Sequence, residues 1–466
     1  MIMTEISIFI FRRDLRLNDN TSLIEICKKH KNVVPIFIFT PEQVTKKNNF
    51  KSDNAIEFMI ESLLELQNDL KSKGSDLLVF QDTNINALKR IHKHYKIKSV
   101  AFNQDYTPYA KQRDEEIKLW CDSNSIECII QEDYLLMPVG SILKPDKTPY
   151  TIYTPFRNKG VHLPVNKPNT TLKTNSLSPS TFIKLVNKSL KTKGFIKHSQ
   201  NPNKLVKGGR VYALKKLQSI KSFKTYNKDR NTPSIPTTQL SAYIKFGNVS
   251  IREVYWKMRQ ILGMNNQLID QLFWREFYFY IVHYFPKVLQ GKPFNVRYKA
   301  EVKWRTSKKE LELWQQGKTG YPIVDAGMRQ LNVSGFMHNR LRLITSNFLN
   351  RMLGLDWRHG EVYYAQQLTD YDPSVNNGNW QWTASVGVDP KPYYQRLFNP
   401  WLQSEKFDKN AEYIKQWIPE LKEVPAEHIH KWDVYYKDYP TVNYPPPMVD
   451  YKMARERSIK MFQETK

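Results

Sequence analysis

The chain has 466 residues, and its 71 Lys and Arg against 45 Asp and Glu give a formal net charge of +26. Its 40% of hydrophobic residues can bury a large core and contain no run near the roughly 20 apolar residues of a membrane span, so an unstructured basic tail and a membrane-spanning protein are excluded. Excess positive charge of this size favours a polyanionic partner, most simply nucleic acid.

The N-terminus and the cysteines indicate a soluble, intracellular protein. Glu5 precedes a short apolar stretch that charged residues follow, which fits a first β-strand better than a signal peptide. The only cysteines, Cys27, Cys121 and Cys128, lack the spacing of metal ligands. They predict a reducing compartment and no metal site.

From residue 6 to about 132, short apolar runs alternate with helical patterns. The predicted strands are Ile6–Phe11, Val33–Phe39, Asp76–Phe80, Ser99–Asn103 and Glu127–Gln131. Between the second and third strands, apolar residues at helical spacing from Ile56 to Leu70 predict a long amphipathic helix. This alternation predicts an α/β domain with a doubly wound parallel five-stranded sheet. No Gly-rich phosphate loop follows the first strand, which disfavours an ordinary dinucleotide-binding domain.

The rest of the chain predicts a linker and a second, larger domain. Residues 1–132 form the predicted α/β domain, 133–205 an interdomain linker and 206–466 an all-α domain. Residues 151–230 contain 18 Lys and Arg and a single acid, which is +17 of the +26. The composition of 160–205 is typical of a solvated loop, and the alternative, a phosphate-facing surface, is favoured near Lys207–Arg210 and Arg230.

One predicted helix of the second domain combines aromatic and polar residues on one face. Gln271, Trp274, Arg275 and Tyr278 are spaced so that they lie together. Such a face suits a site that stacks on a flat ligand and hydrogen-bonds its edge. The alternative is an aromatic helix buried in a bundle.

Three further segments carry polar groups that a core does not require. Residues 337–342 place an amide and two guanidinium groups within about one turn, as a ligand site or as a surface patch. Residues 368–382 contain two acids two apart, an Asn/Gly run and a Trp-x-Trp, and they lack the final Glu of a calcium loop. Residues 237–241 form a hydroxyl-rich turn that could hold a phosphate or cap a helix.

Together these segments resemble the DNA photolyase and cryptochrome family, and within it the class I cyclobutane pyrimidine dimer photolyases. The matching motifs are WREF at 274–277, GKTGYPIVDAGM at 317–328, MHNR at 337–340, NNGNWQW at 376–382 and FNP at 398–400. FRRDLRL at 11–17 and YPPPMVD at 444–450 extend the resemblance over nearly the whole chain.

The resemblance implies that the helical domain holds FAD, whose reduced form donates an electron to a pyrimidine dimer under blue or near-UV light. The residues implied to bind the flavin phosphates are Tyr226, Thr237, Thr238, Gln239, Leu240 and Ser241, with Gln239 where Arg is common. Those implied around the flavin ring are the ion pair Arg342 and Asp370, the lining residues Tyr371 and Asp372, and Asn376 facing N5. An amide at N5 supplies no acidic proton, and Arg342 favours an anionic reduced ring.

Trp380, Trp357 and Trp304 match the family's electron relay, which leads from the flavin to the surface. This relay lets light reduce an oxidised flavin. The alternative is that the three rings only pack in the core.

The resemblance also implies a DNA site. Trp274 and Trp382 match the pair that packs against a flipped-out dimer, and Gln271 and Asn339 would hydrogen-bond its bases. The other residues implied to contact DNA are Arg230, Arg275, Tyr278, Arg340, Arg396 and Gln403.

Four positions bear on the activity and the antenna. Gln271 stands where Glu is usual and Leu343 where Met is usual, which puts the strength of repair in question. Asn339 replaces the catalytic His of the (6-4) photolyases and argues against their activity. Ala110 stands where folate-binding members have Glu, so a folate antenna is disfavoured and a deazaflavin or no antenna stays open.

The main hypothesis is therefore a monomeric lyase that repairs dimers in UV-damaged DNA, away from membranes. The first alternative is a cryptochrome, a blue-light receptor with the same flavin site and no repair. A long signalling tail is not expected, because the chain ends soon after the family's closing helix. The second alternative is a basic nucleic-acid-binding protein without a cofactor, which would be colourless.

Overall fold

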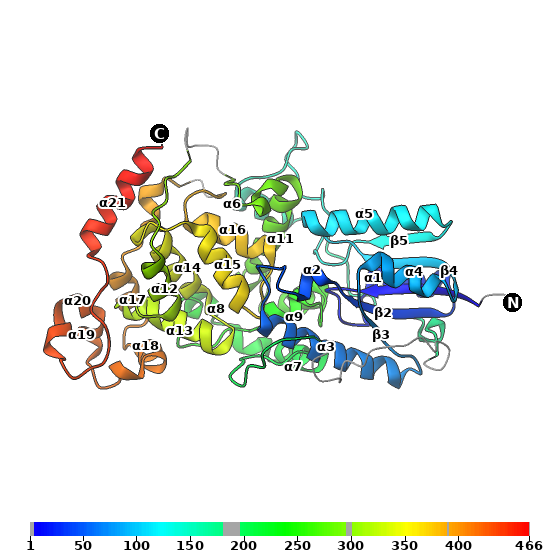
Figure 1. The fold of residues 1–466 in the computed structure, drawn as a ribbon, viewed down its shortest axis with the longest axis horizontal. Helices are drawn as coiled ribbons and strands as arrows, with labels where there is room; N and C mark the ends of the chain where they lie inside the picture. Colours follow the sequence, from blue (N-terminus) through cyan, green and yellow to red (C-terminus); the bar gives the residue numbers. More distant parts are fainter. Residues whose placement is uncertain (1–3, 180–195, 295–300, 389–390, 466) are drawn as a thin grey trace.

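The computed structural model describes residues 4–179, 196–294, 301–388 and 391–465, and its N-terminal part is built around a parallel sheet (Figure 1). The strands are β1 Glu5–Phe11, β2 Val33–Phe39, β3 Leu78–Gln81, β4 Lys96–Asn103 and β5 Glu127–Gln131, in the spatial order β3-β2-β1-β4-β5. Neighbouring strands pair in parallel. The predicted five-stranded parallel sheet is confirmed, and β2 and β5 have the predicted bounds.

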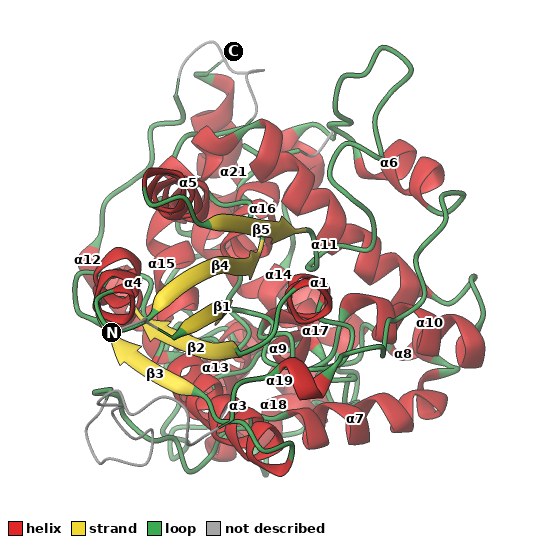
Figure 2. Cartoon of the chain, turned by 90° about the vertical axis from the view of Figure 1, so that its right-hand side faces the viewer, coloured by secondary structure: helices red, strands yellow, loops and turns green. Residues whose placement is uncertain are grey.

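Helices cover both faces of the sheet, as a doubly wound fold requires (Figure 2). The helices of this part are α1 Thr21–Lys29, α2 Pro41–Val44, α3 Asp53–Ser72, α4 Asn84–His92 and α5 Pro108–Ser123. Because side chains alternate along a strand, Phe9 and Phe11 of β1 join the core cluster that contains α1 and α3. Ile8 and Ile10 join the cluster of α4 and α5 on the other face.

The third strand begins two residues later than predicted. The Asp76 carboxylate accepts hydrogen bonds from the backbone N–H of Leu77 at 2.8 Å and from Gln67 Nε2 at 2.9 Å. This side chain fixes the turn that follows α3, so the strand begins only at Leu78.

The remainder is mostly helical, as predicted, and it lies beside the sheet part in Figure 1. Its α-helices are α6 Tyr153–Gly160, α7 Arg210–Gln218, α8 Tyr226–Asp229, α9 Ser241–Lys245, α10 Ile251–Leu262, α11 Gln267–Tyr284, α12 Lys308–Gln316, α13 Pro322–Ser334, α14 Asn339–Asn347, α15 Trp357–Gln367, α16 Pro373–Thr383, α17 Pro400–Phe407, α18 Glu412–Trp417, α19 Ala426–His430, α20 Trp432–Tyr435 and α21 Tyr451–Gln463. The shorter turns are η1 Thr174–Ser176, η2 Ser219–Phe223, η3 Pro286–Gln290, the π-helical η4 Phe348–Met352, η5 Tyr393–Arg396, η6 Pro419–Leu421 and η7 Tyr436–Asp438. No helix within the described ranges is both long and apolar enough to span a bilayer.

The predicted linker is anchored to both parts of the molecule at several points. The backbone N–H of Ser178 donates to the Val33 carbonyl of β2 at 2.8 Å, and Leu177 is buried beside it. Val165 and Ile196 are buried in the same core cluster. The predicted solvated loop over 160–205 is therefore packed at these residues, and its positions 180–195 lie outside the described part of the chain.

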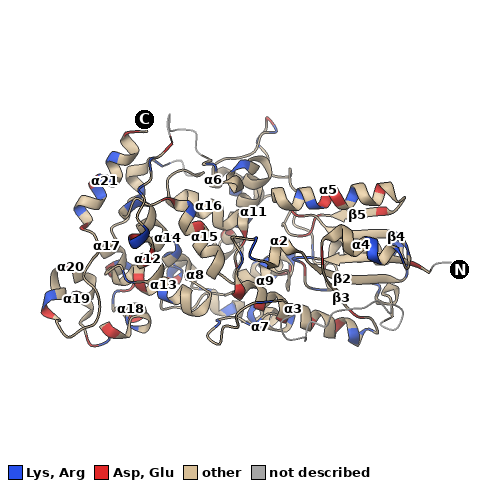
Figure 3. Cartoon of the chain, viewed as in Figure 1, with Lys and Arg blue, Asp and Glu red and all other residues tan. Residues whose placement is uncertain are grey.

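Buried ion pairs join the sheet part to the helical part. Arg252 of α10 bonds Asp19 at 2.9 Å and Asp133 at 2.8 Å, and Arg16 bonds Asp133 at 2.6 Å. Arg13, two residues after β1, pairs with Asp372 at the start of α16. The two parts thus share a charged interface, whereas most Lys and Arg are spread over helices and loops of both parts (Figure 3).

Candidate functional site

Helix α16 is the centre of the candidate site. Its first residue is Pro373, and Asp372 caps it by accepting from the backbone N–H of Ser374 at 3.0 Å and of Val375 at 3.3 Å. Burial raises the pKa of Asp372, but Arg13 and Arg275 outweigh it and hold the pKa below its ordinary value. The cap therefore stays a carboxylate, and it fixes the helix that carries three of the predicted residues, Asn376, Trp380 and Trp382.

The Asn376 amide is held in one orientation. The side chain is 9% exposed, and its Nδ2 donates to the backbone carbonyl of Glu361 at 3.1 Å. Asn377 Nδ2 donates to the carboxyl Oε1 of the same Glu361 at 2.8 Å. The carbonyl oxygen of Asn376 makes no hydrogen bond within the described residues, so it is available to accept one.

The predicted ion pair between Arg342 and Asp370 is present. Arg342 Nη2 lies 3.1 Å and 2.9 Å from the two carboxylate oxygens, and its Nε donates to the Met337 carbonyl at 2.9 Å. The pair joins α14 to the segment before α16. Its role toward a flavin stays a prediction.

The hydroxyl-rich turn at 237–241 adopts an unusual backbone conformation. Gln239 has a φ of +54°, and α9 begins two residues later. The hydroxyls of Thr237, Ser241 and Tyr226 make no hydrogen bond with other described residues. Lys216 of α7 reaches the turn and donates from Nζ to Gln239 Oε1 at 2.6 Å.

The three tryptophans predicted to form an electron relay lie on segments that contact one another. A Cβ added to Gly360 of α15 would stand 2.0 Å from the Trp380 ring, so the glycine lets that ring lie against the helix that begins at Trp357. Arg305 forms a β-bridge with Leu355, which brings Trp304 beside the same helix start. Trp380 and Trp357 are 2% and 1% exposed and Trp304 is partly exposed, so the set runs from the core to the surface.

Trp314 lies beside Trp380 in the core, and the sequence analysis did not single it out. Its ring is fully buried, and its centroid lies 6.1 Å from that of Trp380. Trp314 Nε1 donates to the Thr345 carbonyl at 2.9 Å, which fixes the ring. Local sequence gave no signal, because the contact joins residues far apart in the chain.

The two tryptophans predicted to pack against a lesion each contact another side chain. Trp274 lies against Tyr153, another residue that the sequence analysis missed, with ring centroids 3.6 Å apart and planes 8° apart. The Arg396 guanidinium carbon lies 4.0 Å from the Trp382 ring centroid. Both tryptophans remain partly exposed.

Two predicted DNA contacts, Arg230 and Arg340, are brought close together. Arg340 donates from Nε to Asn231 Oδ1 at 3.2 Å, and Arg230 donates to Gln267 Oε1 at 2.6 Å. Burial, and then the nearby Arg230, lower the pKa of Arg340 to about 10. Neither guanidinium forms an ion pair with a carboxylate of the described residues, so the two cations are open to an anion.

Other predicted DNA residues have different surroundings. Arg275 is largely buried and donates to the Tyr134 carbonyl at 2.6 Å, which favours a structural role over the predicted DNA contact. Tyr278 is 4% exposed and donates to Asn379 at 3.3 Å. Asn339 is exposed at the start of α14, and Gln271 donates to a carbonyl of its own helix. Gln403 has a buried carbonyl oxygen without a partner in the described residues.

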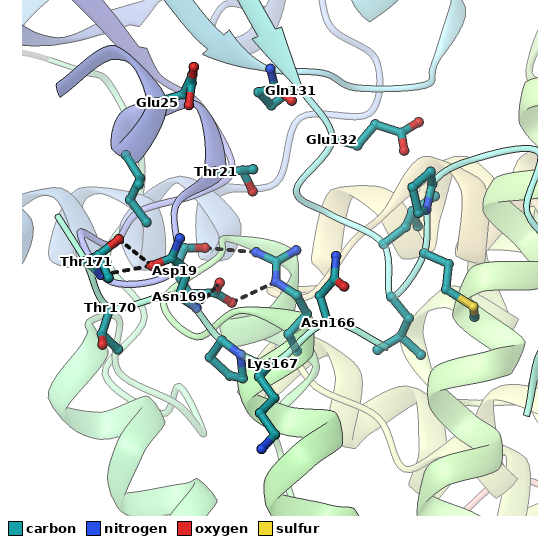
Figure 4. Close-up of a pocket in the computed structure, with 17 residues that line it drawn as sticks. Asp19, Thr21, Glu25, Gln131, Glu132, Asn166, Lys167, Asn169, Thr170 and Thr171 are labelled. Atoms are coloured by element: carbon teal, nitrogen blue, oxygen red, sulfur yellow. Dashed lines mark hydrogen bonds and ion pairs between the residues drawn. The ribbon is translucent and has the colours of Figure 1, made fainter. Parts of the chain in front are cut away.

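A polar cavity of about 780 Å³ lies elsewhere, between α1, the segment after β5 and the predicted linker (Figure 4). Asp19, Asn169 and Arg252 line it, and Asp19 bonds both of the other two. None of the predicted flavin or DNA residues lines this cavity.

The residues around α16 fit FAD in their chemistry. Three buried polar atoms near the predicted flavin residues have no partner in the described chain: Trp380 Nε1, Ser374 Oγ and His338 Nε2. The hydroxyls of the turn and the Lys216 ammonium suit the phosphates of FAD. The Arg342–Asp370 ion pair and the free amide oxygen of Asn376 suit its redox ring. No group of three or more metal-ligating side chains occurs among the residues described.

Comparisons with known proteins point in one direction. A family profile described as DNA photolyase matches residues 7–170, and one described as the FAD binding domain of DNA photolyase matches residues 268–464. The deoxyribodipyrimidine photo-lyase of Escherichia coli (strain K12) is 34% identical, and the match covers 97% of each chain. That of Buchnera aphidicola subsp. Acyrthosiphon pisum is also 34% identical, over 98% of this chain and 96% of the relative.

Solved structures agree with these matches. An archaeal photolyase from Sulfolobus tokodaii, described with two FAD molecules, has a TM-score of 0.86 and 36% identity over 99% of this chain and 100% of the other. A bacterial class III photolyase from Agrobacterium tumefaciens has a TM-score of 0.90 and 29% identity, over 100% and 98%. A cryptochrome from Synechocystis sp. PCC6803 has a TM-score of 0.89 and 25% identity, over 99% and 100%.

Proposed function

The chain belongs to the DNA photolyase family and functions in light-dependent DNA repair, and from this premise we propose which of its residues split cyclobutane pyrimidine dimers. One observation carries the proposal. Helix α16 presents Asn376, Trp380 and Trp382 within eleven residues, so a flavin contact, a relay ring and a lesion contact are fixed by one capped helix.

The flavin environment is set by Asn376 and the Arg342–Asp370 pair. When bound, reduced FAD supplies an electron to the lesion after it absorbs light. Asn376 offers a carbonyl oxygen, which accepts an N–H and gives no proton. Arg342 provides positive charge that favours an anionic ring, and Asp370 keeps that guanidinium from standing unpaired.

The phosphates of FAD would be held at the turn by the free hydroxyls of Thr237 and Ser241 and by Tyr226. Thr238, Gln239 and Leu240 shape this turn, and Thr238 Oγ1 accepts from the Leu240 N–H at 3.4 Å. Tyr371 and Asp372 would line the ring. The support is the donor chemistry of these side chains.

Trp380, Trp357 and Trp304 form the proposed route by which light reduces an oxidised flavin. The contact at Gly360 and the bridge at Leu355 support this order. The route ends at the partly exposed Trp304, where a solution reductant can return the electron.

The DNA surface is proposed around Trp274, Trp382, Arg230 and Arg340. The two arginines would hold the backbone phosphates, because they lie together without a carboxylate. The two tryptophans would pack against the extruded dimer, and extrusion is easiest where the bases already stack poorly. Gln271 and Asn339 would bond the base edges, and Arg396 and Gln403 would lie at the border of the lesion.

We further propose an intracellular monomer that acts on UV-damaged DNA. The three cysteines are free thiols, which fits a reducing compartment. We propose an α/β domain at 1–132, an interdomain linker at 133–205 and a helical FAD-binding domain at 206–466. For the antenna we propose a chromophore other than folate, or none, since Ala110 is buried and its side chain offers no hydrogen bond.

The test is a repair assay on an oligonucleotide that carries one thymine dimer. Pre-reduced wild-type protein is expected to restore thymine under blue light, and Trp382→Ala to lose most of this activity while it retains flavin. Light-dependent flavin reduction without any restored thymine would indicate the cryptochrome alternative. A colourless purified protein would contradict both.

A further inference from the structure

The phosphate turn contains no cationic side chain of its own. Residues 237–241 read Thr-Thr-Gln-Leu-Ser, and the side chain at its centre is the neutral Gln239. The diphosphate of FAD carries two negative charges, which hydroxyls alone balance poorly. A charge from another element would therefore strengthen binding.

Lys216 is placed to supply that charge. Its Nζ lies 2.6 Å from Gln239 Oε1, although 23 residues separate the two in sequence. An ammonium group has three N–H donors, and the amide occupies one of them. Lys216 forms no ion pair with a carboxylate of the described residues, so the remaining donors are open to an anion.

The element that carries Lys216 is fixed in place. Arg210 at the start of α7 bonds Glu253 of α10 at 2.7 Å and 3.1 Å, and Ala213 and Leu217 of α7 are buried. The backbone N–H of Val211 also donates to Glu65 at 2.8 Å. The ammonium is thus carried by an anchored helix and held by the Gln239 amide, so little side-chain order has to be gained when an anion binds.

We propose that Lys216 is a phosphate-binding residue for FAD, which supplies from α7 the positive charge that the turn lacks. The inference rests on the proposed function, because it takes the turn at 237–241 as the diphosphate site. Gln239 then has a positioning role, since its amide oxygen holds the ammonium beside the turn. No sequence motif predicts this pairing.

The adjacent Lys215 offers a matched control. It is exposed on the same helix, its Nζ lies 5.7 Å from the ring of Tyr212, and it makes no hydrogen bond to the described residues of the turn. Lys215→Gln and Lys216→Gln remove the same charge from neighbouring positions. Only the second removes the bond to Gln239.

The experiment measures FAD release from diluted holoenzyme by flavin fluorescence, at low and high salt. Lys216→Gln is expected to weaken FAD retention about three- to tenfold, with a smaller salt effect than wild type. Lys215→Gln and Lys216→Arg should stay near wild type, and Lys216→Gln combined with Gln239→Arg should recover retention.

Equal FAD retention by wild type and Lys216→Gln would overturn the assignment and leave the repair proposal standing. An equal loss in Lys215→Gln would also overturn it, since the effect would then be general charge. Conversely, a wild type that holds FAD and repairs no dimers would refute the proposed function, and the comparison of the lysine variants would still decide the role of Lys216.

Discussion

The rings of Tyr153 and Trp274 are stacked, with centroids 3.6 Å apart and planes 8° apart. Tyr153 begins α6, within the predicted linker, and its hydroxyl donates to the Asp270 carbonyl of α11 at 2.9 Å. Arg157 of the same helix bonds the Asp270 carboxylate at 2.8 Å. The linker therefore supports the tryptophan that we propose to pack against the lesion.

Tyr153→Leu is expected to weaken binding of dimer-containing DNA by at most roughly two- to twelvefold, because Trp274 loses an aromatic pair worth about 0.5–1.5 kcal/mol that holds its ring in place before the lesion binds. Tyr153→Phe keeps the ring and should bind nearly as wild type. The measurement is the dissociation constant for damaged and undamaged oligonucleotides of equal length. An equal loss for both DNAs would show that Tyr153 does not act through the lesion.

Most of the sheet could be predicted, because β1 and β2 are buried runs rich in β-branched and aromatic residues. The start of β3 at Leu78 could not, since a hydrogen bond to the Asp76 side chain decides it. Several candidate site residues could be proposed from the sequence because they stand in short motifs, such as those in α14 and α16. Tyr153 and Lys216 could not, because their partners lie far away in sequence and leave no local pattern.

Arg275 shows a second limit of sequence reasoning. The spacing correctly placed Arg275 on α11 beside Trp274. It could not predict whether the side chain points into the protein interior. The Arg275 guanidinium donates a hydrogen bond to the Tyr134 carbonyl. Arg275 therefore joins α11 to the segment after β5.

Trp304→Phe should slow light-driven reduction of oxidised flavin by at least tenfold and leave repair by pre-reduced protein nearly unchanged. The reason is that Trp304 is proposed to end the relay at the surface, which takes no part in electron donation to the dimer. Absorbance under steady blue light with a reductant follows the first step. Trp417 is also partly buried, and Trp417→Phe is the control. Loss of repair by pre-reduced, folded Trp304→Phe would refute the relay assignment.

Arg340→Gln should weaken binding to damaged and undamaged DNA alike, since a phosphate contact carries no sequence or lesion information. The slope of log affinity against log salt should fall by about one. Lys308→Gln, at an exposed lysine 3.8 Å from Glu312, is the control and should change neither quantity. Selective loss for damaged DNA would place Arg340 at the lesion instead of the backbone.

Glu361→Gln should change how stability depends on pH. Burial raises the pKa of Glu361 to about 7 from an ordinary 4.5, against the opposing hydrogen bond from Asn377. Between these two pH values Glu361 is protonated in the folded state and ionised in the unfolded state. The free energy of unfolding therefore falls as pH rises through that range.

The Gln variant stays neutral and keeps the bond to Asn377, so its advantage over wild type should grow across that range, to at most about 3 kcal/mol. Free energies of unfolding at several pH values test this. Glu427→Gln, whose side chain is 72% exposed, serves as the control. An advantage that does not change with pH would show that Glu361 is not buried as a neutral acid.

We propose that one site around α16 uses light to split pyrimidine dimers. Thymine restored per dimer by pre-reduced protein, measured under blue light and in the dark on one sample, tests this proposal. Repeated turnovers are expected in light and none in the dark. No restored thymine in light, from protein that holds reduced FAD and binds the damaged DNA, would contradict it.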